Sequence, residues 1–511
     1  MESHHSAVRA ISSRIRKFSA REEPFRIYHG STNSTRPSQY RRSKMVDTSG
    51  LVNVLRVDTA SKTALVEPNV PMDSLVEATL RHGLIPPVVM EFPGITVGGG
   101  FAGTAGESSS FRYGFFDRTI NWIEIVLANS DVVRASSKVR PDLFYGAASS
   151  FGTLGVTTLL EVQLIEAKTF VALTHYPVSS ITQAQKVIEE ATNDFSNDYL
   201  DGIMYAEDRG VICVGRLTND VASSVKVQRF TRPTDPWFYI HVDRLMKNQS
   251  SPITEAVPIV DYLFRYDRGG FWVAKYAYDY FITPFNRVTR FVLDYFMHTR
   301  VMYHALHQSG LASKYIIQDV AIPYPKVNEF MKYLDTSFNS YPVWLCPLKQ
   351  SGKGIASTHS LQPDKRNHKL PDFMLNFGVW GPGPKRREDF VAWNRQFEGM
   401  IQKLGGQKWL YAHAYYTEEE FNEIYNRLDY EALREKYHAS YLPTVYDKVR
   451  VNVEKENKEM HDSWVAWLLA IFWSIWPLTG LYGVYHALFG GDYLLPKTTS
   501  RGITELSVCA S

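Results

Sequence analysis

Residues 93–114 read PGITVGGGFAGTAGESSSFRYG, a stretch made mostly of glycine and hydroxyl-bearing residues. Glycine allows backbone N–H groups to converge on an anion, and serine and threonine hydroxyls add further donors. The stretch therefore predicts a loop that cradles a phosphate or diphosphate. For any single loop of this composition, a plain turn is the alternative.

Part of the stretch also matches the G-x-G-x-x-G pattern, at Gly98, Gly100 and Gly103, with Glu124 downstream. In a Rossmann fold these glycines open an amphipathic helix, and an acidic residue follows about 20 positions later. Here the chain runs on into the hydroxyl-rich residues 106–110, so we expect a loop of a different nucleotide-binding fold.

Two other loops share this composition, HGSTNST at 29–35 and SSFGTLGV at 149–156. Strand-like segments separate the three loops: 64–68, the pair 123–127 and 131–134 around an Asn129-Ser130 turn, and 156–165. A helix is expected from Pro71 to Gly83. The spacing of apolar residues in 1–20 predicts an amphipathic helix. Its apolar face would pack against the rest of the protein, and a helix that lies on a membrane surface is the alternative. Residues 1–166 thus predict an α+β domain.

Residues 167–412 predict a second α+β domain. The strand-like segments are 202–205, 210–215, 315–323, 343–347 and 374–380, and the helical segments are 180–190, 327–334 and 387–404. Residues 272–306 are unusually aromatic. Such a run is either ordinary core or an apolar route into a pocket for a large apolar ligand.

The chain of 511 residues is too long for one core, and its net charge of +3 does not suggest a nucleic-acid partner. Cys213, Cys346 and Cys509 have no metal-ligand spacing and form no disulfide framework. We therefore expect that the protein binds no metal and lies in a reducing compartment. Met1 to Ala20 is no secretory signal.

The C-terminal part differs from the rest. Residues 463–491 contain no Asp, Glu, Lys or Arg, and 464–489 read WVAWLLAIFWSIWPLTGLYGVYHALF. This exceeds the roughly 20 apolar residues that cross a bilayer, and Trp and Tyr favour its interfaces. Pro477, Gly480 and Gly483 weaken a straight span, so a bent or re-entrant hairpin is possible, and a buried helix is the alternative. We expect a membrane-associated segment at 463–491, preceded by return helices and a charged linker at 413–462 and followed by a tail at 492–511.

Several segments together resemble one known family. They are LRVDTASKTALVEPNV (55–70), ITVGGGFAGTAGESSSFRYGFF (95–116), DLFYGAASSFGTLG (142–155), DPWFYIHVD (235–243), IIQDVAIP (316–323), YPVWLCPLK (341–349), YTEEEF (416–421), LREKY (433–437) and YDKV (446–449). The loops resemble the flavin domain of vanillyl-alcohol oxidase and p-cresol methylhydroxylase relatives. The whole set resembles the delta-24-sterol reductases (diminuto-like).

The resemblance implies a two-subdomain FAD-binding domain with an α+β substrate, or cap, domain. It also implies FAD-dependent reduction of a side-chain carbon–carbon double bond in a sterol or triterpenoid, with NADPH as hydride donor. The protein would lie at a membrane, the endoplasmic reticulum, with its catalytic part facing the cytosol. This chain departs from the animal and plant reductases in two features. Their apolar anchor is N-terminal, whereas the apolar segment here is C-terminal. The GSTNST loop is also closer to generic members of the flavin fold than to those reductases.

FAD is expected to be held by the three loops. The candidate cofactor-binding residues are Gly30, Ser31, Thr32, Asn33, Ser34, Gly94, Thr96, Val97, Gly98, Gly99, Gly103, Thr104, Gly106, Glu107, Ser108, Ser109, Gly155 and Val156. Relatives that attach flavin covalently use His or Cys. Here Asn33 or Ser34 stands at that place, no Cys occurs in residues 1–212, and His29 ends a strand, so we expect non-covalent FAD.

Reducing an unactivated alkene requires a proton donor as well as a hydride. The candidates are Glu107, Tyr113, Tyr411 and Tyr415. Glu107 and Tyr113 lie in the flavin loop, where they could instead bind only the cofactor, and the two later tyrosines could be ordinary core residues. Rival functions are an FAD-dependent oxidase or dehydrogenase of an alcohol or terpenoid, which this fold also hosts, and a non-enzymatic lipid-binding protein.

Overall fold

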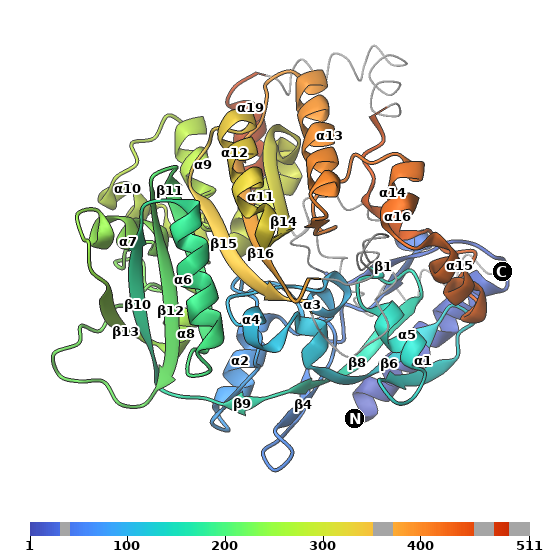
Figure 1. Ribbon diagram of the computed structural model, residues 1–511. Coiled ribbons are helices and arrows are strands. Elements are labelled where there is room, and N and C mark those ends of the chain that lie inside the picture. Colours follow the sequence, from blue (N-terminus) through green and yellow to red (C-terminus); the bar gives the residue numbers. More distant parts are fainter. Residues whose placement is uncertain (31–40, 351–370, 454–474, 490–511) are drawn as a thin grey trace.

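A computed structural model describes residues 1–30, 41–350, 371–453 and 475–489 (Figure 1). Helix α1 (Glu2–Ser19) has the predicted amphipathic character, because Val8, Ile11, Ile15 and Phe18 are all buried against the first domain. The helix packs one apolar stripe on the protein, as expected from its sequence.

The first domain is built on a five-stranded antiparallel sheet with the order β3-β4-β8-β6-β7. Its strands are β3 (Val54–Asp58), β4 (Thr63–Val66), β6 (Ile120–Leu127), β7 (Val132–Ser136) and β8 (Gly155–Gln163). The predicted helix is α2 (Met72–Leu80), and the short strands β1 (Arg26–Tyr28) and β2 (Met45–Asp47) pair in parallel beside the sheet. In the β6–β7 turn Ser130 takes a positive φ of 77°, which explains why the chain reverses there.

The second domain contains an eight-stranded antiparallel sheet, order β13-β10-β12-β11-β15-β16-β14-β17. The strands are β10 (Phe170–Val178), β11 (Tyr199–Ala206), β12 (Arg209–Thr218), β13 (Ile253–Pro258), β14 (Tyr315–Pro323), β15 (Val343–Lys349), β16 (Phe373–Pro382) and β17 (Gln407–Lys408).

Helices α6 (Ile181–Asn193), α12 (Val327–Ser337) and α13 (Arg387–Lys403) cover one face of this sheet (Figure 1). Side chains alternate between the two faces, as a strand requires. In β16, Leu375 and Phe377 join the core under the helices, whereas Met374 and Trp380 join the core on the other side.

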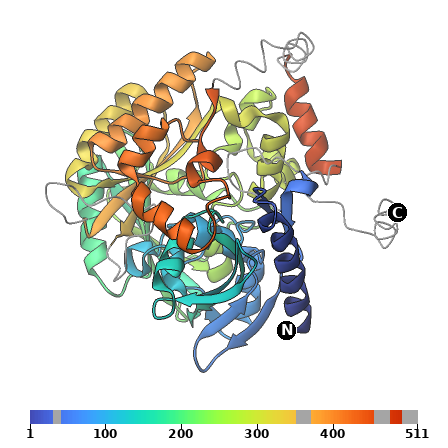
Figure 2. The ribbon, with the colours of Figure 1, turned by 90° about the vertical axis from the view of Figure 1, so that its right-hand side faces the viewer.

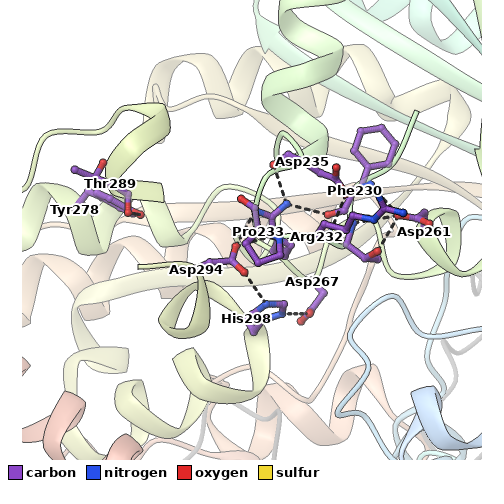
Figure 3. Close-up of polar contacts among 12 residues, drawn as sticks. Phe230, Arg232, Pro233, Asp235, Asp261, Asp267, Tyr278, Thr289, Asp294 and His298 are labelled. Carbon is purple, nitrogen blue, oxygen red and sulfur yellow. Dashed lines mark hydrogen bonds and ion pairs between the residues drawn. The ribbon is translucent and has the colours of Figure 1, made fainter. Parts of the chain in front are cut away.

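The aromatic segment lies against that other side. It contains α9 (Ala274–Tyr280), α10 (Arg287–Val292) and α11 (Thr299–Ser309), and a polar cluster fixes it in place (Figure 3). Arg268 binds the Asp294 carboxylate at 2.7 Å and donates to the carbonyl oxygen of Phe230. His298 contacts Asp267 at 2.5 Å and Asp294 at 3.4 Å. Buried charge pairs therefore tie the start of α11 to the segment around residue 230.

After the second sheet, the chain returns to the first domain through α14 (Glu418–Ile424), α15 (Arg427–Lys436) and α16 (Val445–Val449). Tyr430 bonds Thr153 at 2.6 Å, and Tyr441 donates to the carbonyl of Ala128 at 2.6 Å. The first contact holds the return helices against the third predicted loop, and the second holds the return segment against the β6–β7 turn.

Helix α19 (Leu478–Phe489) packs beside α11 at the edge of the molecule (Figure 2). Gly480 and Gly483 face Tyr280 and Ala305, which permits the close approach. Across the described ranges, no helix combines the length and apolar character needed to cross a membrane. Of the predicted membrane segment 463–491, residues 463–474 and 490–491 lie outside the described residues.

Candidate active site

A cavity of about 860 Å³ lies where the two domains meet. Its wall contains the glycine-rich segments 94–106 and 150–157 of the first domain together with residues of α9, α11 and α19. Such a volume, mostly apolar with a few polar groups, is typical of a site for a cofactor and a sizeable ligand.

The glycine-rich segment at 97–103 forms a short helix, α3 (Val97–Gly103), rather than an open loop. Thr96 caps it, because its Oγ1 accepts a hydrogen bond from the Gly99 N–H at 3.1 Å. A side chain at Gly98 would meet the Pro68 backbone oxygen at 2.9 Å, whereas a Cβ atom at Gly103 would have no neighbour within 4 Å and would face the cavity. The expectation of a loop was wrong here, since the cap and close packing of the glycines stabilise a turn of helix.

The cavity brings together about half of the candidate cofactor residues. Gly94, Thr96, Gly98, Gly99, Gly103, Gly106, Glu107, Gly155 and Val156 line it. Val97, Ser108 and Ser109 are buried behind its wall, Thr104 faces a small separate hollow, and Gly30 does not line it. Ser31, Thr32, Asn33 and Ser34 lie outside the described residues.

Sequence reasoning missed several lining residues, among them Asn69 and Lys448. Lys448 reaches the cavity from α16 and donates to the carbonyl oxygen of Phe151. His29 follows β1, as predicted, and also lines the cavity. Burial, aided by the charge of Lys448, lowers the pKa of His29 to about 4, so this ring is neutral. The only signal in the sequence that points to Lys448 is the family resemblance of the YDKV segment that carries it.

These residues fit a large dinucleotide. The glycines expose backbone to the cavity, Lys448 supplies positive charge for a diphosphate, and the buried His29 Nδ1 has no hydrogen-bond partner within the described structure. An orphaned buried polar atom facing a cavity indicates a missing ligand partner. FAD would be held by α3, the segment 150–157 and Lys448.

Three carboxyl groups, Glu91, Glu107 and Asp319, face the same cavity. The buried Arg265 binds Glu91 at 2.8 Å and Asp201 at 2.9 Å. Burial raises the pKa of Glu91 to about 7 even though Arg265 opposes the shift. Burial also raises the pKa of Glu107 well above its usual range, and the charges of Glu91 and Asp319 raise it further. Both effects favour the protonated form of Glu107, and its side chain keeps some accessible surface.

Of the four proposed proton donors, Glu107 and Tyr411 line the cavity. Tyr411 Oη lies 2.5 Å from Asp319 Oδ2. Tyr113 and Tyr415 do not line the cavity, because Tyr113 stacks near Arg112 and Tyr415 belongs to the core under α13. The positions of these two tyrosines argue against a role as donor.

The aromatic run serves both purposes that its sequence left open. Trp272 is buried in the core, whereas Tyr276, Phe281 and Phe296 line the cavity. Leu481 and Val484 of α19 also line the cavity. The aromatic segment and α19 therefore contribute a largely apolar part of the wall.

Comparisons with known proteins agree with this geometry. A family described as "FAD binding domain" matches residues 6–136. The delta(24)-sterol reductase of Arabidopsis thaliana is 30% identical over 459 residues, covering 82% of this chain and 80% of its own length. The chain belongs to the delta(24)-sterol reductase family. Reductases of this name from Homo sapiens and Macaca fascicularis are each 28% identical over 458 residues, covering 87% of this chain and 86% of their own.

Membership in the delta(24)-sterol reductase family confirms the resemblance of the sequence segments. The FAD match covers most of α1, the strands β1 to β4, β6 and β7, and the α3 segment, and so confirms a flavin domain at the N-terminal end. The FAD-domain match favours the flavin loop over the Rossmann site, and the family match favours an enzyme over the non-enzymatic lipid-binding protein.

Proposed function

We propose that this protein is an FAD-dependent reductase that adds hydrogen across a side-chain double bond of a sterol or related triterpenoid, with NADPH as the hydride donor. The observation that carries the proposal is one cavity whose wall combines the glycine-rich segments, aromatic side chains and the carboxyl groups of Glu91, Glu107 and Asp319. Reduced FAD supplies a hydride when bound, so the protein must supply the proton.

The cavity also suggests how the substrate lies. Glu107 belongs to the flavin segment, and Glu91 and Asp319 lie close enough for their charges to raise its pKa. Tyr276, Phe281 and Val484 line the cavity from the aromatic segment and α19. The alkene must reach a proton donor, so the side chain would point toward Glu107 and Tyr411 and the ring system toward α19. Aromatic faces near the alkene would stabilise the cationic character that develops on protonation.

Anaerobic titration tests the reaction. Purified yellow protein should be bleached by NADPH and regain its colour when a sterol with an unsaturated side chain is added, with a product heavier by two hydrogens. A flavin that NADPH does not reduce, but that an alcohol reduces with release of peroxide in air, would show that the protein is an alcohol oxidase instead.

The flavin is proposed to be non-covalent. Acid precipitation of the protein should leave the yellow colour in the supernatant, and colour that stays in the pellet would contradict the proposal.

Attachment of residues 463–491 to a membrane, at the endoplasmic reticulum with the catalytic part toward the cytosol, is a further part of the proposal. In α19 the side chains of Tyr485, Leu488 and Phe489 are exposed, and residues 475–489 carry no Asp, Glu, Lys or Arg. A helix with an uncovered apolar face favours an apolar surface. Truncation after Asp462 should move the protein from the membrane pellet to the supernatant, and a full-length chain that is already in the supernatant without detergent would refute the attachment.

A further inference from the structure

Asp319 is a cavity-lining carboxyl group that the sequence did not single out. It lies in β14 and accepts a hydrogen bond from Asn376 Nδ2 of β16 at 3.0 Å, while its other oxygen contacts Tyr411 Oη at 2.5 Å. Both carboxyl oxygens are therefore engaged, and the group has a fixed orientation. The backbone carbonyl of Asp319 also accepts from Trp409 N at 3.0 Å, which holds the Tyr411 segment against β14.

Glu107 and Tyr411 approach the cavity from different domains. Glu107 belongs to the segment that would hold the flavin, and its backbone N–H donates a hydrogen bond to Ser110 Oγ at 2.8 Å. Tyr411 belongs to the cap domain, next to β17. Tyr411 therefore reaches the cavity from the domain that would hold the substrate, whereas Glu107 reaches it from the segment that would hold the flavin.

We propose that Tyr411 delivers the proton to the alkene and that Asp319 is the positioning residue that orients the Tyr411 hydroxyl and replaces its proton. This inference rests on the proposed function. As hydride reaches one alkene carbon, the Tyr411 O–H bond breaks and a C–H bond forms at the other carbon. The proton of the Asp319 carboxyl passes to Tyr411 Oη, leaving Asp319 as a carboxylate that regains a proton from solvent. Two electrons leave the flavin and enter the alkene, so the step balances.

The surroundings of Asp319 support a carboxyl that can hold a proton. Burial raises the pKa of Asp319 to about 6, although the hydrogen bonds from Tyr411, Asn376 and Trp380 lower it. The titratable groups that face it are Glu107, Tyr303 and Tyr411, and none of these brings a positive charge. The acid form is needed, so the rate should fall as pH rises through the Asp319 pKa. A bound sterol excludes more water and would move that midpoint upward.

The experiment measures reoxidation of dithionite-reduced flavin by a side-chain-unsaturated sterol under anaerobic conditions, from pH 5 to pH 9. The use of dithionite makes the assay independent of NADPH. Tyr411→Phe should slow this half-reaction on the order of 100-fold, within the range of general-acid contributions. Asp319→Asn should slow flavin reoxidation about 10-fold and remove the decrease of its rate with rising pH. The double variant should be no slower than Tyr411→Phe, because residues that act as a unit are not additive.

Tyr415→Phe is the matched control, because this tyrosine lies outside the cavity, and it should react at the wild-type rate. Flavin content and circular dichroism establish that each variant is folded. If a variant does not fold, the wild-type enzyme still tests the inference, since its rate must decline with rising pH and fall in deuterium oxide.

The outcomes separate two failures. Wild-type protein whose reduced flavin never reacts with the sterol refutes the proposed function. A wild-type protein that reacts, together with a full rate in Tyr411→Phe and a large loss in Glu107→Gln, overturns the assignment to Tyr411. A slowed Asp319→Asn variant with an unchanged pH profile would mean that Asp319 only packs, and it would overturn the positioning role.

Discussion

The indole N–H of Trp409 donates to the carbonyl oxygen of Thr104 at 2.9 Å. Trp409 follows β17 in the cap domain, and Thr104 ends α3 in the flavin domain. Trp409 also packs edge-on against Phe115, with ring centroids 5.6 Å apart. This contact sets the cap domain against the flavin segment, so the relative placement of the cavity-lining Glu107 and Tyr411 depends on how the two domains pack.

Gly103 provides a direct test of the flavin site. Its missing side chain opens onto the cavity with nothing within 4 Å, so Gly103→Leu should fold normally yet project into the space of the cofactor. We expect flavin occupancy, measured by absorbance of the purified protein, to fall at least tenfold with the melting temperature of the apoprotein unchanged. Gly399→Leu, on an exposed part of α13 with equal space, should keep its flavin. Full occupancy in Gly103→Leu would place the cofactor elsewhere.

Arg265 should be essential for folding stability. Its guanidinium is buried between Glu91 and Asp201, and Arg265→Met leaves both carboxylates without their cation. Removing one partner of a buried ion pair costs about 3 to 5 kcal/mol. Urea unfolding of the purified protein measures the loss in free energy of unfolding. Arg386→Ala, which breaks an exposed pair with Glu388, should leave the unfolding midpoint where it is.

His298 should make stability depend on pH in the alkaline range. Burial alone would lower its pKa, but hydrogen bonds to Asp267 and Asp294 outweigh burial and raise the pKa to about 9 from 6.5. Because the folded pKa is raised, the stabilisation is complete below pH 6.5 and is lost as pH rises through about 9. The ring is partly exposed, so we expect a contribution on the order of 1 kcal/mol.

Thermal melting at several pH values measures the His298 contribution. His298→Gln should melt lower than wild type at pH 6, and the two melting temperatures should converge near pH 10. A constant difference across this range would show that the charge of His298 contributes nothing.

Gly483 should control the position of α19. A Cβ atom there would lie 2.6 Å from the Ala305 carbonyl oxygen, a backbone atom that cannot move aside. Gly483→Leu should therefore push α19 away from α11, at a cost of about 1 to 3 kcal/mol. Because Leu481 and Val484 line the cavity, sterol affinity should weaken several-fold with flavin content unchanged.

Leu488→Ala, on the exposed side of α19, serves as the control for sterol binding. Equal sterol affinities in the two variants would show that α19 does not form part of the sterol site.

Much of the local structure could be predicted from sequence alone. The strand expected at 315–323 is β14 with the same bounds, and the helix expected after Pro71 is α2. These predictions succeeded because alternation, capping and turn residues act between near neighbours. The segment 97–103 was misjudged as a loop, because its helix depends on packing against Pro68 and on the cap at Thr96.

The sequence by itself determined the flavin fold and the family, since the three loops and the segments around them occur in a fixed order along the chain. Only the tertiary structure decided which side chains face the cavity. Asp319 and Tyr411 are 92 positions apart, and Lys448 lies 297 positions from Phe151. Such pairs form when the eight-stranded sheet and the return helices close on the flavin domain. Local patterns carry no information about that closure, because it depends on strand register and long-range packing.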